Sequence, residues 1–120
     1  MSLEMINGTP ALIGSVAINA QTGTSYTYAA SDAWNTMVTL ANASAITLTI
    51  PPNASVAFPV GTVLNFAQTG AGQVTVTQGS GVTIVSNGAT ASAPKTRVQY
   101  SSGSAIQTSA NNWLVIGDIA

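Results

Sequence analysis

Few side chains in this sequence can take part in catalysis or bind a metal, and their types exclude most classes of reaction. The chain has three acidic and two basic residues, and it has neither histidine nor cysteine. This composition excludes the Ser-His-Asp triad, cysteine nucleophiles and thiolate metal sites. A glycosidase needs two carboxylates about 5–10 Å apart, and no motif supports Asp32 and Asp118 as such a pair. We therefore expect no enzymatic activity, no metal and no cofactor.

The remaining charges are too few to attract a charged partner. The formal net charge is −1 and 4% of the residues are charged, whereas a typical domain has about 25%. A nucleic-acid-binding protein needs a basic stripe, and a peripheral membrane anchor needs a polybasic cluster. We therefore expect neither nucleic acid nor membrane as a partner. Neutral polar side chains give little electrostatic repulsion against self-association, which favours a protein that functions inside an assembly.

Two basic residues offer polar contacts. Lys95 and Arg97 are two positions apart, so on a strand they share a face. They either pair with Asp118 or Asp32 on the domain's own surface or form a bridge to another subunit. On the second interpretation, Lys95 and Arg97 are predicted partner-binding residues.

Sugar stacking is the other contact chemistry that the sequence offers. Exposed tryptophan and tyrosine rings form platforms for sugars, and Trp34 lies in the turn-rich stretch S-D-A-W-N-T. Packing in the core or at an interface is the default interpretation for every aromatic side chain here. Among them, Trp34 together with Asp32 and Asn35 is the best prediction for a glycan contact.

Short strands separated by turns must position these residues. Runs of β-branched and aromatic residues alternate with period two, with threonine on the opposite face, as is typical of antiparallel sheets buried on one side. Glycines in the segments 70–72 and 79–81 indicate hairpin loops. We predict an all-β domain over residues 15–120, an antiparallel β-sandwich or small barrel-like domain, with at most one helical turn near 55–58. The strands are predicted at 15–18, 25–29, 36–40, 45–50, 62–66, 73–78, 82–85, 97–100, 104–108 and 113–116.

The segment 1–14 differs from the rest of the chain. It is apolar, N-G and T-P pairs interrupt it, and no strand partner lies nearby in the sequence. It is either an edge strand or plug of the domain's own core, or an arm that docks on a neighbouring subunit. We predict a short extended N-terminal arm over residues 1–14. Its apolar side chains are predicted partner-binding residues: Met5, Ile6, Leu12 and Ile13.

The second half of the chain resembles a known module. Residues 47–63 read T-L-T-I-P-P-N-A-S-V-A-F-P-V-G-T-V, a string that resembles a β-domain recurring in tailed-bacteriophage virion proteins. Segments 70–76, 81–84, 95–101 and 113–118 follow in the order and spacing of that module. It occurs in tail fibres, head fibres and capsid decoration proteins, which are typically trimeric and non-enzymatic.

The resemblance implies a virion structural protein on the outer surface of the phage particle, with a homotrimer as the expected assembly. Most fibre occurrences lie at the end of a much longer chain, whereas this chain is the module plus a short arm. The resemblance therefore favours a capsid decoration (cement) protein that binds the major capsid protein, or another virion protein, and stabilises the assembled head. The alternative is a trimeric tail-fibre or head-fibre module that binds host surface glycan.

Overall fold

We describe residues 15–120 of the chain from a computed structural model. The predicted arm over residues 1–14, with Met5, Ile6, Leu12 and Ile13, lies outside the described residues. Within them, the secondary structure consists of short strands and one 3₁₀ helix, η1. In chain order the elements are β1 (Ala17–Gln21), β2 (Ser25–Thr27), η1 (Ala30–Ala33), β3 (Thr36–Leu40), β4 (Ile46–Ile50), β5 (Val63–Gln68), β6 (Val74–Gln78), β7 (Thr83–Val85), β8 (Ser102–Ser109) and β9 (Asn112–Gly117).

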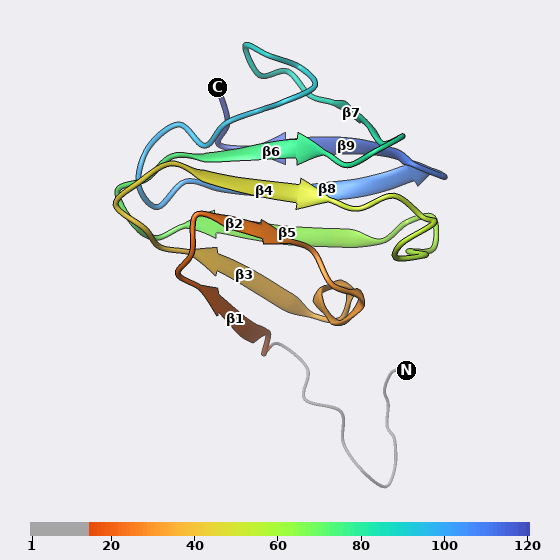
Figure 1. Cartoon of the computed structure of the whole chain (residues 1–120), viewed down its shortest axis with the longest axis horizontal. Coiled ribbons are helices and arrows are strands. Elements are labelled where there is room, and N and C mark those ends of the chain that lie inside the picture. The colour runs from red at the N-terminus through yellow and green to blue at the C-terminus, as the bar shows by residue number, and fades with distance from the viewer. Residues whose placement is uncertain (1–14) are drawn as a thin grey trace, which may run out of the picture.

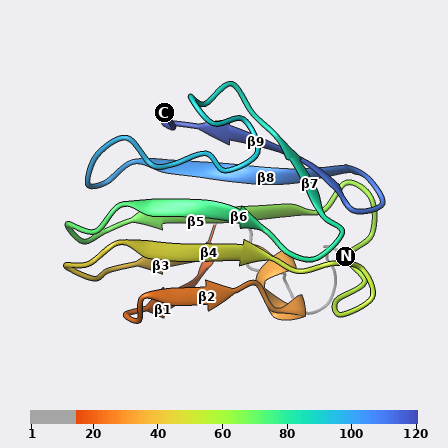
Figure 2. The same ribbon diagram turned by 45° about the horizontal axis from the view of Figure 1, so that its top comes forward.

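The strands form two sheets wound from successive turns of the chain. The six-stranded sheet has the order β1-β3-β5-β8-β9-β7 and the three-stranded sheet the order β2-β4-β6. Both views show the smaller sheet lying over the larger one (Figures 1 and 2). From β1 to β6 the chain alternates between the sheets, so we call each of the pairs β1–β2, β3–β4 and β5–β6 a coil.

The predicted all-β class is confirmed, but the antiparallel prediction is wrong for most strand pairs. Among the strands of residues 15–120, β5–β8 and β8–β9 are antiparallel, whereas β1–β3, β3–β5, β2–β4, β4–β6 and β7–β9 are parallel. Strands from successive coils enter a sheet in the same direction, so they pair in parallel. The loops 70–72 and 79–81 are not the predicted hairpins, because each connects strands of different sheets.

Glycine is needed in the loop 70–72 because the corners of successive coils stack on one another. The backbone N–H of Gly72 donates to the carbonyl of Asn42 at 2.7 Å, and the Asn42 side chain donates to the Thr22 carbonyl at 2.8 Å. A Cβ atom on Gly72 would lie 1.9 Å from the carbonyl oxygen of Ser44. The close approach of two backbones, rather than a tight reversal, therefore explains this glycine.

The core lies between the sheets and takes one face of each. Alternate residues of each strand point inward, where β-branched and aromatic side chains pack well. Phe58 packs edge-to-face against Trp113, with ring centroids 5.7 Å apart. The buried apolar side chains are Tyr28, Val38, Leu40, Ile46, Leu48, Ile50, Phe58, Leu64, Phe66, Val74, Val76, Val82, Ile84, Ala105, Trp113 and Val115.

The buried side chain of Thr96 makes hydrogen bonds at the free edge of β6. The hydroxyl of Thr96 accepts from the backbone N–H of Val74 at 2.9 Å and donates to the Gln68 side chain. Lys95 forms a bridge to Thr75 of β6. The strand predicted at 97–100 therefore does not form, because the pairing stops one residue earlier at Thr96 and a turn follows.

The single helical turn also differs from the prediction. It occupies Ala30–Ala33 rather than the segment 55–58, which is a turn and loop. Asp32 explains why the helical turn forms at this position, because its carboxylate accepts from the backbone N–H of Ala29 at 2.8 Å. Across residues 15–120, none of the structure is a helix of the length and apolarity needed to cross a membrane.

Candidate functional site

The outer face of the six-stranded sheet is rich in aliphatic side chains, with Asn65 and Ser104 among them. Cross-strand pairing aligns one apolar row over β5, β8, β9 and β7, and apolar side chains also stand at both ends of the adjacent row. Four of these side chains are between 40% and 61% exposed, which is unusual for large aliphatic residues on neighbouring strands. We call this set the aliphatic face: Ile18, Met37, Val63, Val85, Ile106, Leu114 and Ile116.

The outer face of the three-stranded sheet is instead covered with hydroxyl groups. Parallel pairing aligns one row across Ser25, Thr47 and Thr75, and a second row across Thr27, Thr49 and Thr77. We call these six residues the hydroxyl face. The molecule thus presents an apolar surface on one side and a neutral, hydrated surface on the other.

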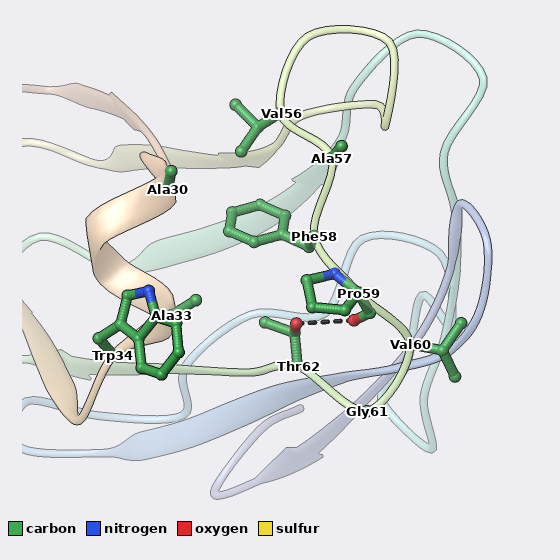
Figure 3. A pocket seen from close by; sticks show the side chains of 10 residues that line it. All are labelled: Ala30, Ala33, Trp34, Val56, Ala57, Phe58, Pro59, Val60, Gly61 and Thr62. Carbon is green, nitrogen blue, oxygen red and sulfur yellow. Dashed lines mark hydrogen bonds between the residues drawn. The ribbon is translucent and has the colours of Figure 1, made fainter. Parts of the chain in front are cut away.

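Trp34 stands at the rim of the molecule, directly after η1. Its side chain is 80% exposed, and it lines two separate hollows. The first, of about 410 Å³, lies between η1 and the loop 56–62. Figure 3 shows Trp34 and Ala33 on one side of it and Phe58, Pro59 and Thr62 on the other. This apolar hollow is lined by Ala30, Ala33, Trp34, Val56, Ala57, Phe58, Pro59, Val60, Gly61 and Thr62.

The second hollow, of about 450 Å³, is more polar. We call it the polar hollow; it is lined by Ala17, Ile18, Asn19, Ser31, Asp32, Trp34 and Thr36. Asp32 is 2% exposed. Its Oδ2 atom accepts from the Tyr26 hydroxyl at 2.6 Å and from the backbone N–H of Ala29. Its Oδ1 atom accepts from the Asn19 amide at 2.9 Å.

Two tyrosines beside this carboxylate have altered acidity. Burial, together with the hydrogen bond to Asp32 and the charge of its carboxylate, raises the pKa of Tyr26 to about 12. Burial also raises the pKa of Tyr28 well above its ordinary value. Both hydroxyls therefore remain protonated donors at neutral pH; that of Tyr28 donates to the Asn65 carbonyl at 3.0 Å.

The structure brings together two of the three residues predicted to contact glycan. Trp34 and Asp32 both line the polar hollow, whereas Asn35 lines neither hollow. The Asn35 backbone carbonyl accepts from Ala17 at 2.8 Å and its side chain donates to the Ser15 carbonyl. Asn35 therefore fixes the start of β1, and its contact with a glycan stays a prediction.

Lys95 and Arg97 are both exposed and flank the buried Thr96. Arg97 forms the ion pair foreseen with Asp118, with 2.8 Å between Nε and Oδ1. Hydrogen bonds from Arg97 and Ser101 lower the pKa of the Asp118 carboxyl. The Lys95 ammonium lies 3.4 Å from the Thr75 hydroxyl and pairs with no carboxylate among residues 15–120.

Sequence reasoning missed the aliphatic face, although the sequence contains a signal for it. In β9 the apolar residues run consecutively as W-L-V-I from 113 to 116, and β7 ends in I-V. Alternation would leave every second position polar, so consecutive apolar residues predict a strand with two apolar faces. Trp113 and Val115 are buried, and Leu114 and Ile116 lie on the opposite side.

Comparisons with known proteins show no family for this chain. No protein-family model matches the chain, and no curated protein matches its sequence. Within residues 15–120, no three histidine, cysteine or acidic side chains gather where they could hold a metal ion. The surfaces on which a partner could bind are therefore the two unlike outer faces and the rim at Trp34.

Proposed function

We propose that this chain is a structural protein of a tailed-phage virion, a decoration protein that binds the outer surface of the assembled head. The observation that carries the proposal is the contrast between its two outer faces. Burying exposed aliphatic area stabilises a contact by roughly 25 cal/mol per Å². A hydroxyl-covered face, in contrast, remains well hydrated. Such a molecule is suited to lying with its aliphatic face against another protein and its hydroxyl face toward water.

A decoration protein stabilises its capsid by mass action. It binds the assembled lattice and not the free subunits, so each bound copy shifts the equilibrium toward the intact shell. Many weak contacts on one particle act together and give high avidity. The arm residues Met5, Ile6, Leu12 and Ile13, with Lys95 and Arg97, are proposed as additional contacts to the capsid or to a neighbouring copy.

The test is attachment of the purified protein to heads prepared without it. We expect the wild type to co-sediment with these heads and to raise the temperature at which they break open. Val85→Asp and Ile116→Asp, at exposed positions of the aliphatic face, should each abolish co-sedimentation. Thr47→Asp places the same charge on the hydroxyl face and should leave attachment intact. Equal binding by all three variants, or unchanged disruption temperature, would contradict the proposal.

Self-association into a homotrimer is part of the same proposal. Among residues 15–120, β1 and β2 each pair on one side only, so two sheet edges lie open at the first coil. Neither strand contains the lysine or proline that commonly protects an edge. Sedimentation equilibrium should give three times the monomer mass of 12.0 kDa. A monomer at concentrations that support attachment would contradict the trimer.

A second candidate function is a fibre module that binds host surface glycan. Trp34 favours it, because a tryptophan that is 80% exposed beside two hollows is poorly explained by packing within the chain. The purified protein should then bind host cells, and Trp34→Ala should remove that binding. Copy number distinguishes the two functions, since a decoration protein is present in hundreds of copies per particle and a fibre in a handful.

A further inference from the structure

The two hollows beside Trp34 differ in chemistry, and the ring borders both of them. Trp34 lines both hollows, and their volumes lie within the range of about 300–1,000 Å³ that is usual for small-molecule sites. The flat indole face offers a large apolar surface, and its ring N–H offers one donor. A matching ligand has one flat apolar face, an apolar substituent at one end and polar groups at the other.

The apolar hollow is formed for a small hydrocarbon group. Phe58 lies in its lining, is 4% exposed and is held edge-to-face by Trp113. Two of its side chains carry a polar group, Thr62 and the ring N–H of Trp34. The Thr62 hydroxyl already donates to the Pro59 carbonyl at 2.7 Å, as Figure 3 shows. A hydroxyl group placed there would lose its hydrogen bonds to water, whereas a methyl group would gain burial.

The lining of the polar hollow suits neutral polar groups. A carboxylate oxygen accepts about two hydrogen bonds, and Oδ1 of Asp32 receives one from the side chains of residues 15–120. Ser31 adds an exposed hydroxyl beside it. Neither hollow contains lysine or arginine in its lining. A buried carboxylate without a basic neighbour repels an anionic ligand.

We propose that Trp34 is the platform of a binding site for a neutral saccharide that carries a methyl substituent, on a 6-deoxy or an N-acetyl group. The sugar ring stacks on Trp34, the methyl group enters the apolar hollow, and ring hydroxyls occupy the polar hollow, where they accept from Ser31. This inference deepens the second candidate function and rests on it. The polar hollow shares Ile18 with the aliphatic face, and the inference uses no other residue of that face.

Calorimetric titration with four soluble probes tests the ligand class. The probes are a trimer of N-acetylglucosamine, a rhamnose trisaccharide, cellotriose as the methyl-free control, and a galacturonic acid trimer as the anionic control. We expect at least one of the two methyl-bearing sugars to bind about tenfold more tightly than cellotriose, which corresponds to about 1.4 kcal/mol. The galacturonic acid trimer should not bind.

Three exposed substitutions locate the site. Trp34→Ala should weaken binding of the methyl-bearing sugar about tenfold or more, since it removes the platform. Ala30→Leu should fill the apolar hollow and reduce the preference over cellotriose. Tyr100→Ala removes an aromatic side chain that is 74% exposed and lines neither hollow, so it should leave binding unchanged.

The outcomes separate the inference from the function on which it rests. Equal, Trp34-dependent binding of cellotriose and the methyl-bearing sugars would overturn the methyl preference and leave glycan binding in place. Binding that Trp34→Ala does not weaken, or absence of binding by all four sugars, would overturn the inference. If Trp34→Ala also left host-cell binding unchanged, the second candidate function would fall with it.

Discussion

Asp32 is the residue that holds the first coil together. Its carboxylate accepts from Asn19 of β1, from Tyr26 of β2 and from the backbone of Ala29. Asn19 also donates to the Tyr26 hydroxyl at 2.9 Å and accepts from Gln21 at 2.8 Å. A buried carboxylate satisfied by several donors is stable, and the loss of its acceptor oxygens leaves those donors unpaired.

Asp32→Asn should therefore lower the free energy of unfolding by about 2–3 kcal/mol. The substituted amide keeps the shape of the side chain but turns a donor toward groups that also donate. Urea denaturation measures the effect. Ser31→Ala, in the same 3₁₀ helix but with an exposed hydroxyl, is the matched control and should be nearly neutral. Equal stability of the two variants would show that the carboxylate is not needed.

Tyr26 should make the free energy of unfolding depend on pH in the alkaline range. Its pKa is about 12 in the folded protein against 10.0 as its ordinary value. A group whose pKa is raised by folding contributes its stabilisation below the unfolded value and loses it as pH rises through the folded value. The free energy of unfolding should therefore fall between pH 10 and pH 12.

Tyr26→Phe removes that titrating hydroxyl and should make the fall smaller. Urea denaturation of both proteins at the two ends of this pH range gives the comparison. Tyr28 remains in the variant, so part of the fall should persist, because burial raises its pKa as well. An identical pH dependence in wild type and variant would contradict the assignment to Tyr26.

Residue types predicted the Trp34 site only in part. The turn-rich surroundings of Trp34 offered an exposed ring as one interpretation, and the ring is exposed, with Asp32 beside it in the lining of the polar hollow. The sequence could not indicate that Asp32 is buried, because Asp32 lies in η1 and its donors Asn19 and Tyr26 lie in β1 and β2. Nor could it show that Asn35 lines neither hollow; its backbone φ is 47° and its side chain donates to the Ser15 carbonyl.

At the scale of elements, the stacked corners determine how closely successive coils approach. Each corner contacts the next through backbone atoms, and Gly72 lies against Ser44 with no room for a side chain. Gly23 occupies the corresponding corner of the first coil, but there the nearest atom to an added Cβ is 3.8 Å away. A methyl group therefore has room at Gly23 but not at Gly72.

Gly72→Ala should lower the free energy of unfolding by about 3 kcal/mol or more, because either β4 or β6 must move to admit the methyl group. Gly23→Ala should change it little. Thermal or urea unfolding of the two variants measures the difference. Comparable stability of both variants would mean that the corners are not tightly stacked.

The strands themselves were largely predictable, but their directions were not. The segment 36–40 was predicted with the bounds that β3 has, and β4 and β6 begin one residue inside the predicted ranges. Alternation reports only that one face of a strand is buried, and that is equally true of parallel coils and antiparallel hairpins. A glycine between two strands is likewise compatible with a reversal and with a stacked corner.

At the scale of the whole molecule, a nearly uncharged protein should attach without help from long-range electrostatics. Co-sedimentation with heads should change little between about 0.1 M and 1 M NaCl, because there are few charges for salt to screen. Sulfate should strengthen attachment, since it favours burial of apolar surface. Loss of binding at high NaCl would instead assign the contact to charged groups, with Lys95 and Arg97 as the first to test.

Parallel pairing also determines the order in which this molecule opens. Each parallel neighbour is a full coil away along the chain, as with Val38 and Phe66, so the chain must close a long loop before the pair forms. β5, flanked by β3 and β8, should exchange its amide hydrogens last, and the end strands β1 and β2 should fray first. The aliphatic face extends from Ile18 on β1 to Val85 on β7. A protein bound to this face would contact both end strands of the sheet, so it should also slow the exchange of amide hydrogens in β1.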